Sequence, residues 1–389
     1  MTVVTTADVS AQSKPRRHLD WVLMVSTAAL AAFGVLIVHS ATAARLENAG
    51  ADPYSYLKRQ LVWLVLGAIA MAVTVIVDYH RFQSWAPAMY IGVVALLVLV
   101  LTPLGSEVNG AKGWFGFGAF AVQPAELLKP VMVVVLATVA SNGRGPFDVK
   151  RLLRMLGLVA VPLGLLVLQP DLGSVMIFCF ATFAMLVVAG AKTRHLVVIG
   201  VIGVIGVVGA LQLGVVKDYQ RARLTSFLDP QSNERASYNL RQSLTAIGNG
   251  GVTGRGLFEG SQTNLSYVPE QQNDFIFTAI GEQLGLIGAL SVVIVYGLVV
   301  WRGVHTALLS RDFFGTLLAA GATAMIGFQA FLNMGVTVAV MPVTGVTLPL
   351  VSSGGSSILA TCILVGMILN VHLRRFSRTP LSPSLSANS

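Results

Sequence analysis

Charged residues are scarce in this sequence. Lys, Arg, Asp and Glu make up only 11% of the 389 residues, whereas 54% are hydrophobic, and the mean hydropathy is +0.75. A soluble domain covers its surface with about 25% charged residues, so this composition excludes a soluble globular protein. It predicts a polytopic membrane protein, which we expect to be all-α.

Cysteine is scarce as well. Cys179 and Cys362 both lie in apolar runs, which excludes a disulfide framework and a cysteine metal cluster. Nucleotide-binding motifs are missing, because the glycine-rich strings KGWFGFG and NGGVTGRG neither follow a β-strand pattern nor have the Walker A form. We therefore expect no nucleotide cofactor. The net charge of +9 reflects membrane topology and does not indicate a nucleic-acid partner.

Ten apolar runs have about the length that spans a bilayer, roughly 20 residues. They cover residues 21–41, 60–78, 84–103, 125–141, 152–168, 172–190, 195–216, 274–301, 314–338 and 355–373. Together they form one transmembrane domain over residues 19–375, with a long polar loop at about 217–273. The tails at 1–18 and 376–389 are predicted to be disordered.

The basic residues of the short loops lie mainly at the amino terminus, in the even-numbered loops and in the carboxyl tail. Such residues are retained on the cytoplasmic side, so we expect both termini in the cytoplasm and the long loop outside. Four stretches rich in Gly, Pro, amide or acidic residues then all fall on outward connections. They are residues 109–129, 168–174, the end of the long loop through 275, and 342–357. This one-sidedness predicts a composite site that opens outward.

Asp274 stands at the end of the long loop, directly before an apolar run. A carboxylate at this boundary can reach both a lipid-borne substrate and solvent, which makes Asp274 the leading candidate for catalysis. Asp before an apolar run is also a favoured helix N-cap. The position alone allows both roles.

Other ionisable residues near the outer boundary are candidates for substrate binding, because charges at membrane depth are costly unless paired, hydrated or functional. Glu126 and Lys129 share one helical face, where they either line the site or form a pair that fixes helix packing. Asp171 follows a tight turn and either reaches the site or caps a helix. Glu282 lies two turns beyond Asp274 on nearly the same face, and either lines the same cavity or bonds a neighbouring helix.

The long loop is basic, and its arginines include Arg221 and Arg255. They form either a solvated face or a surface that attracts a phosphate-bearing lipid head group. An enzyme at the outer face cannot use ATP, so its substrate must already carry a leaving group. A lipid-linked sugar pyrophosphate would meet that requirement.

Five motifs resemble those of the SEDS family (shape, elongation, division and sporulation). They follow the order of that family between about Leu19 and Arg374, and they read NGAKGWFGFGAFAVQPAELLKP, LQPDLGS, QSLTAIGNGGVTGRGLFEGSQTN, VPEQQNDFIFTAIGEQLG and PVTGVTLPLVSSGGSS. Within the family, the strings HLDW, FLDP and GSQTNLSYVPEQQNDF are more similar to the rod-shape subgroup, RodA, than to the division subgroup, FtsW.

The resemblance implies ten transmembrane helices and a peptidoglycan glycosyltransferase of the bacterial cytoplasmic membrane. Its substrate would be lipid II, its role cell elongation and shape, and its partners a class B penicillin-binding protein and other elongation-complex membrane proteins. Asp274 would deprotonate the acceptor sugar, and Glu126, Lys129 and Asp171 would belong to the polar cavity. The resemblance also leaves room for a divalent cation, Mg²⁺ or Mn²⁺, with unassigned ligands.

The sequence departs from the family pattern in two functional motifs. Gly113 precedes Trp114 where many relatives have Arg, and the positive charge is Lys112 instead, which could take the place of that Arg at the substrate but lacks its bidentate fork. The usual acidic pair of the eighth helix reads Glu282-Gln283, so one of the two carboxylates is replaced by an amide.

Two other functions are compatible with the same features. A lipid II flippase would also have many helices, charged cavity residues and Gly/Pro-broken segments, but we would expect its polar features on both sides of the membrane. A scaffold for the partner transpeptidase would leave Asp274 as a helix cap.

Overall fold

A computed structural model describes residues 19–108, 111–117, 120–143, 145, 147–212, 234–265 and 267–375. Its elements, in chain order, are α2 (Trp21–Asn48), α3 (Ser55–Ile76), α4 (Tyr79–Leu101), β1 (Ser106–Val108), β2 (Ala111–Phe117), β3 (Phe120–Val122), α5 (Pro124–Ser141), α6 (Val149–Leu168), α7 (Leu172–Val188), α8 (Thr193–Gln212), α10 (Glu234–Gly250), α11 (Ser261–Asn264), α12 (Ile276–Leu308), α13 (Phe313–Thr337) and α14 (Gly355–Arg374).

Within the described residues, every predicted apolar run overlaps a helix. Among the described residues, eight helices are long and apolar enough to cross a membrane, and α7 and α8 contribute two shorter apolar stretches. The prediction of a helical multi-pass membrane protein is therefore confirmed. The count of ten spanning helices and their orientation stay predictions.

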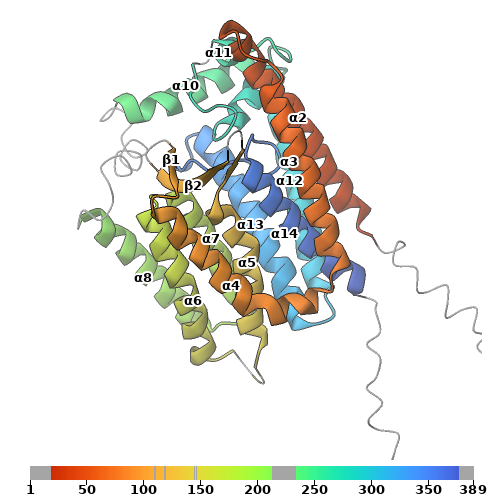
Figure 1. Ribbon diagram of the computed structural model, residues 1–389, viewed down its shortest axis with the longest axis vertical. Helices are drawn as coiled ribbons and strands as arrows, with labels where there is room; N and C mark the ends of the chain where they lie inside the picture. The colour runs from red at the N-terminus through yellow and green to blue at the C-terminus, as the bar shows by residue number, and fades with distance from the viewer. Residues whose placement is uncertain are drawn as a thin grey trace, which may run out of the picture.

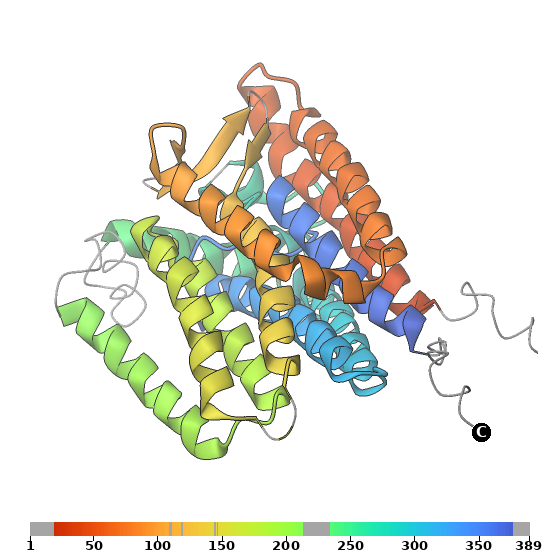
Figure 2. The same ribbon diagram turned by 60° about the horizontal axis from the view of Figure 1, so that its bottom comes forward.

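The helices α5, α13 and α14 lie inside the bundle, and the other long helices surround them (Figures 1 and 2). In its most apolar stretch, α5 is 78% buried and α14 is 83% buried, against 17% for α3. The outer helices expose Val, Leu and Ile, as helices that face lipid do. The inner helices carry several buried polar residues, among them Glu126, Lys129 and Gln329.

The two ends of the transmembrane domain lie on the same side of the bundle. Asp20, which caps α2, forms an ion pair with Arg302 of α12 at 2.8 Å. His372, in the last turn of α14, is 3.8 Å from the same carboxylate. This arrangement agrees with the predicted placement of both termini on one face of the membrane.

A small antiparallel sheet lies between α4 and α5, in the order β1-β2-β3. The expectation of a purely helical chain misses it, because the many glycines of residues 109–118 indicate turns. In β2, Trp114 pairs with Ser106 of β1, and Phe115 pairs with Val122 of β3. Pairing with both neighbours satisfies the backbone of this glycine-rich segment.

The helix α12 is broken at Gly285, where φ is 64° and ψ is −161°. The N–H groups of the next two residues bond to the loop after α10: Leu286 donates to the oxygen of Gly251 at 3.0 Å and Ile287 to that of Val252 at 3.2 Å. A Cβ at Gly285 would lie 2.4 Å from the backbone nitrogen of Gly254. Only glycine fits both this backbone conformation and this close approach.

We therefore expect Gly285→Ala to lower the unfolding temperature markedly. The strained conformation alone costs about 1–3 kcal/mol, and the collision with the loop adds to it. Thermal unfolding in detergent measures the effect, with Gly297→Ala as the control in the same helix, because a Cβ there meets nothing within 4 Å. Equal unfolding temperatures for the two variants would contradict the prediction.

Candidate active site

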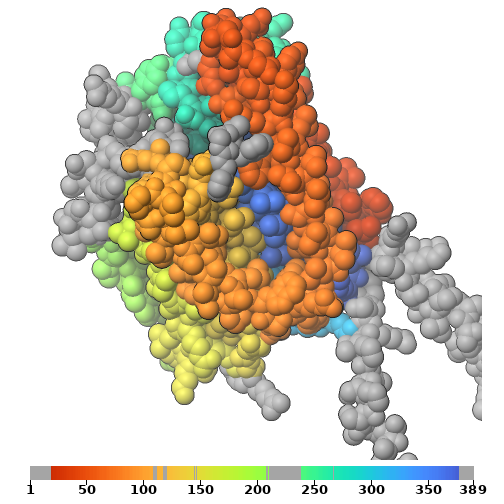
Figure 3. All heavy atoms as spheres, in the orientation of Figure 1, coloured from red at the N-terminus to blue at the C-terminus, as the bar shows by residue number. Residues whose placement is uncertain are grey.

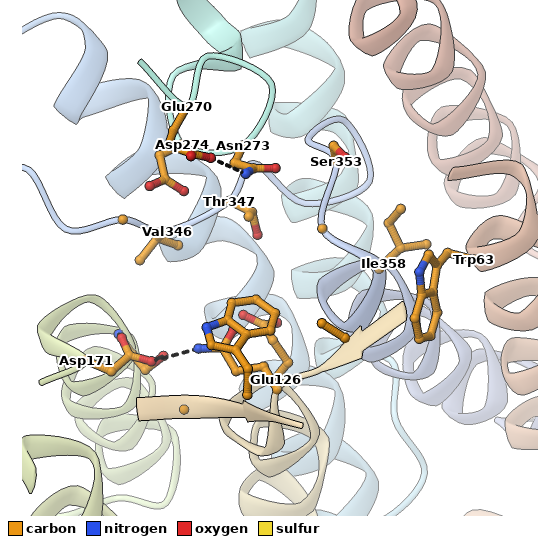
Figure 4. A pocket seen from close by; sticks show the side chains of 18 of the residues that line it. Trp63, Glu126, Asp171, Glu270, Asn273, Asp274, Val346, Thr347, Ser353 and Ile358 are labelled. Atoms are coloured by element: carbon orange, nitrogen blue, oxygen red, sulfur yellow. Dashed lines mark hydrogen bonds between the residues drawn. The ribbon is translucent and has the colours of Figure 1, made fainter. Parts of the chain in front are cut away.

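One polar cavity of about 340 Å³ opens between parts of the chain that are far apart in sequence. Its walls come from α3, the sheet, the start of α5, the turn before α7, the loop before α12 and the loop before α14 (Figure 4). The structure thus brings all four predicted polar stretches to one place.

Asp274 is half-buried and its carboxylate points into this cavity (Figure 4). Two backbone hydrogen bonds fix it: its N–H donates to the oxygen of Glu270 at 3.1 Å, and its oxygen accepts the side-chain amide of Asn333 at 2.8 Å. The N-cap residue of α12 is Phe275, which makes no side-chain capping bond. Phe275, and not Asp274, therefore occupies the N-cap position of α12.

Asp171 combines the two roles that its sequence position allowed. It caps α7, because its Oδ1 accepts the N–H of Ser174 at 2.9 Å, and it also lines the cavity. Its Oδ2 accepts the Ser174 hydroxyl at 2.7 Å and the side-chain amide of Gln123 at 3.2 Å. Burial raises the pKa of the Asp171 carboxyl, and the bonds from Ser174 act in the opposite direction.

Glu126 and Lys129 form the ion pair that their spacing suggested. The Nζ of Lys129 donates to Glu126 Oε1 and to Gln329 Oε1, both at 2.7 Å. Glu126 lines the cavity, and its Oε2 has no hydrogen-bond partner within the described part of the chain. Lys129 is only 1% exposed and lies behind the cavity wall. The lysine thus neutralises a carboxylate that faces the cavity.

The comparisons with known proteins identify the family. Residues 20–376 match the family of FtsW, RodA and SpoVE proteins, described as "Cell cycle protein". The chain belongs to the SEDS family. It is 37% identical to stage V sporulation protein E of Bacillus subtilis, with 92% of this chain and 98% of that protein covered. It is 35% identical to a probable peptidoglycan glycosyltransferase FtsW of Geobacter metallireducens, with 93% and 96% covered.

A solved structure shows the same fold. A chain from a peptidoglycan synthase complex, studied for the structural coordination of polymerization and crosslinking, superposes with a TM-score of 0.78 at 34% identity. The match covers 92% of this chain and 99% of that chain. The family description includes RodA and FtsW alike, so membership of the RodA subgroup stays a prediction.

Several residues predicted to bind substrate lie away from the cavity of this SEDS protein. Glu282 is fully buried and bonds to residues 261–263. Arg255 is exposed, and its Nε donates to the oxygen of Asn249 at 2.8 Å. Lys112 is on β2 but is not among the residues that line the cavity. Arg221 falls outside the described residues.

The cavity has a basic and aromatic wall that sequence reasoning missed. Tyr56, Arg59 and Trp63 of α3 line it, with the guanidinium of Arg59 over the Tyr56 ring at 5.9 Å. Arg59 was not singled out from the sequence as a site residue. The available signal was the spacing of the three residues, because positions i, i+3 and i+7 share one helical face.

Glu270 was also missed. It lines the cavity beside Asp274 and adopts a φ of 52°, which is uncommon for a residue with a side chain. Its carboxylate accepts the side-chain amide of Asn273 at 2.7 Å. Backbone strain of this kind concentrates at functional sites.

The acidic residues do not form a recognisable metal site. In the portion of the chain that the structure describes, no three His, Cys, Asp or Glu side chains are grouped to hold an ion. The divalent cation therefore stays a prediction, and we derive no chemical step from it.

We expect Lys129→Met to destabilise the protein by about 3–5 kcal/mol, because it leaves the Glu126 carboxylate charged and buried. The double variant Glu126→Gln/Lys129→Met should recover most of that loss, since both charges are removed together. Thermal unfolding of the two variants in detergent tests this. A double variant less stable than Lys129→Met would show that the pair has another role.

Proposed function

We propose that this SEDS protein is a peptidoglycan glycosyltransferase that polymerises lipid II at the outer face of the bacterial cytoplasmic membrane. The observation that carries the proposal is the Asp274 carboxylate, which points into a polar cavity built from the predicted outward connections. The relative named a probable peptidoglycan glycosyltransferase supports the reaction class.

Asp274 acts as the general base in this reaction. It accepts the proton of the acceptor's GlcNAc 4-hydroxyl while that oxygen forms a bond to the anomeric carbon of the donor's MurNAc. The bond from this carbon to the pyrophosphate oxygen breaks, and undecaprenyl pyrophosphate leaves with the electron pair. An α-linked donor gives a β-1,4 product, so the reaction inverts. General-base catalysis of this kind contributes about 10²- to 10⁴-fold.

Arg59 stabilises the departing pyrophosphate. Among the described residues that line the cavity, it is the one Lys or Arg side chain, whereas Lys112 and Arg255 lie elsewhere. A guanidinium matches phosphate oxygens with two parallel hydrogen bonds. Positive charge placed where the leaving group develops negative charge lowers the barrier.

The lipid tails have a route to the cavity from the membrane. The helix α3 packs mainly on α14, and α4 packs mainly on α5. The surface is consequently hollowed between α3 and α4, and α14 is visible at the bottom of the hollow (Figure 3). The cavity wall formed by Tyr56, Arg59 and Trp63 belongs to the same helix α3. A polyprenyl chain can therefore remain in lipid while its pyrophosphate reaches Arg59.

The same proposal includes the partners and the cellular role. A class B penicillin-binding protein crosslinks the glycan, which is supported by the similarity to a chain of a synthase complex that coordinates both activities. Other elongation-complex membrane proteins associate with the pair, and the role is elongation and cell shape, as the RodA-like strings suggest.

A flippase is the second candidate, because the break in α12 resembles the broken helices of transporters. The N–H groups freed by that break bond to a loop of the same chain, and neither Gly285 nor its neighbours line the polar cavity. This arrangement favours the enzyme.

We expect Asp274→Asn to abolish glycan synthesis, because the amide is isosteric but cannot accept the proton. Wild type and variant, each purified with the cognate penicillin-binding protein, are compared for lipid II polymerisation, and thermal unfolding checks that they are folded. Asp52→Asn is the control, since Asp52 is an exposed acid in the loop between α2 and α3. Glycan chains from a folded Asp274→Asn variant would refute the catalytic role.

Arg59→Met should lower kcat/KM for lipid II by about 10²-fold, the loss typical when one charge-stabilising donor is removed. Lys58→Met is the matched control, because the adjacent Lys58 is exposed and pairs with Asp52. Initial rates of polymerisation measure both variants. Equal losses in the two would mean that general surface charge, and no specific contact of Arg59, is responsible.

A further inference from the structure

Glu282 is a buried carboxylate outside the cavity. It is 0% exposed, and among the described residues it forms no ion pair. Its charge is satisfied by the loop instead: Oε1 accepts the N–H of Gln262 at 2.7 Å, and Oε2 accepts the N–H of Thr263 at 3.0 Å and the Thr263 hydroxyl at 2.7 Å. A buried charge is tolerated only with such partners, so Glu282 and α11 hold each other in place.

The hydrogen bonds continue from Glu282 to the residue after Asp274. The Thr263 hydroxyl accepts the side-chain amide of Gln271 at 3.1 Å, and that amide also donates to the hydroxyl of Thr278 at 3.0 Å. The Thr278 hydroxyl donates to the oxygen of Phe275 at 2.6 Å. Gln271, Thr263 and Thr278 are all buried. These hydrogen bonds therefore connect Glu282 of α12 to α11, and they connect α11, through Gln271, to the first turn of α12.

The loop is also held by the backbone around Glu282. The N–H of Arg255 donates to the oxygen of Glu282, and the N–H of Gly256 donates to that of Gln283, both at 3.0 Å. At Gly260, a Cβ would lie 2.8 Å from Glu282 Oε2, so the loop approaches the carboxylate as closely as it can. Shortening or neutralising this side chain leaves a gap or unpaired donors.

We propose that Glu282 is a positioning residue, which aims the Asp274 carboxylate into the cavity by anchoring residues 256–272 to α12. This inference rests on the proposed function. The neighbouring Gln283 contacts a different part of the loop, because its Oε1 accepts the N–H of Phe258 at 3.3 Å, and it also accepts the hydroxyl of Ser40 in α2 at 2.6 Å.

The chemistry of the anchor requires a carboxylate. The loop groups that face the two oxygens are donors, namely backbone N–H groups and hydroxyls. Gln at this position keeps one acceptor oxygen but turns an NH₂ donor toward other donors. Glu282→Gln therefore breaks the anchor with almost no change in volume, and Glu282→Asp keeps the charge and should restore part of the function.

The test uses the full chain in complex with its cognate penicillin-binding protein. Rates of lipid II polymerisation give kcat and KM, and hydrogen–deuterium exchange followed by mass spectrometry gives the local stability of residues 256–272. For Glu282→Gln we expect kcat to fall by about 10²-fold, the effect of an active group displaced by about 1 Å, with KM little changed. Exchange should increase in residues 256–272 and stay unchanged in α5, α13 and α14.

Three further variants sharpen the test. Thr263→Val keeps the backbone N–H bonds to Glu282 but removes the hydroxyl link to Gln271, so we expect a smaller loss of kcat. Combining it with Glu282→Gln should add little, because both changes interrupt one chain of bonds. Glu259→Gln is the matched control, an exposed acid of the same loop, and should behave as wild type.

Normal kcat in Glu282→Gln would overturn the proposal. So would a lost kcat with unchanged loop exchange, which would point to direct chemistry, and so would faster exchange throughout the bundle, which would mean a general role in folding. If wild type makes no glycan, the proposed function fails, whereas the exchange experiment still decides the anchor: unchanged exchange in residues 256–272 would overturn it.

Discussion

The side-chain amide of Asn333 in α13 joins the two loops that form the outer part of the cavity. Its Nδ2 donates to the backbone oxygen of Asp274 at 2.8 Å and to that of Val346 at 2.6 Å, and the residue is 1% exposed. One turn earlier, the amide of Gln329 donates to the oxygen of Thr347 at 3.0 Å, while its oxygen accepts Lys129. Because α13 is itself enclosed by other helices, these two amides fix the loops relative to a rigid element.

Three buried carboxylates of this bundle are satisfied in two different ways, because an unpaired polar group in a membrane interior is costly. The Glu126 carboxylate is paired with Lys129, and the Asp20 carboxylate with Arg302. Glu282 is satisfied by neutral donors of a loop. The Asp20–Arg302 pair joins α2 to α12, and Lys129 joins α5 to α13 through its bond to Gln329, whereas Glu282 fixes a loop to a helix. This difference explains why Glu282 is the carboxylate linked to the placement of Asp274.

The sequence predicted the helices well, because a helix that spans the bilayer needs a run of roughly 20 apolar residues, which is visible in the sequence. It also singled out Asp274, Asp171 and Glu126, which the structure brings to one cavity. The prediction for Glu282 placed it on the same helical face as Asp274, which assumes that the helix includes both residues. The helix begins at Ile276, so that argument does not apply, and Glu282 lies about 9 Å along the axis from the start of the helix.

Arg59 and the sheet were missed for a different reason. Both depend on contacts between segments that are far apart in the chain: Arg59 faces the cavity because α3 packs along α14, and β2 is a strand because β1 and β3 pair with it. In a sequence, a basic residue near a helix end is usually explained by membrane topology, and a glycine-rich string is usually explained by turns. Only the tertiary arrangement shows that Arg59 lines the site and that the glycine-rich string forms a strand.

The size of the cavity constrains how the proposed reaction proceeds. At about 340 Å³ it is near the lower limit for small-molecule pockets, about 300 Å³, whereas the reaction requires two lipid-linked disaccharides. Under the proposal, the cavity would hold only the reacting ends of the two substrates, the pyrophosphate near Arg59 and the acceptor hydroxyl near Asp274, while their remaining parts would extend into the hollow between α3 and α4 and beyond the outer loops. The orientation of the pyrophosphate and of the acceptor hydroxyl would then depend on the residues that line the cavity. For this reason a displacement of the loop that carries Asp274 should affect turnover more than affinity.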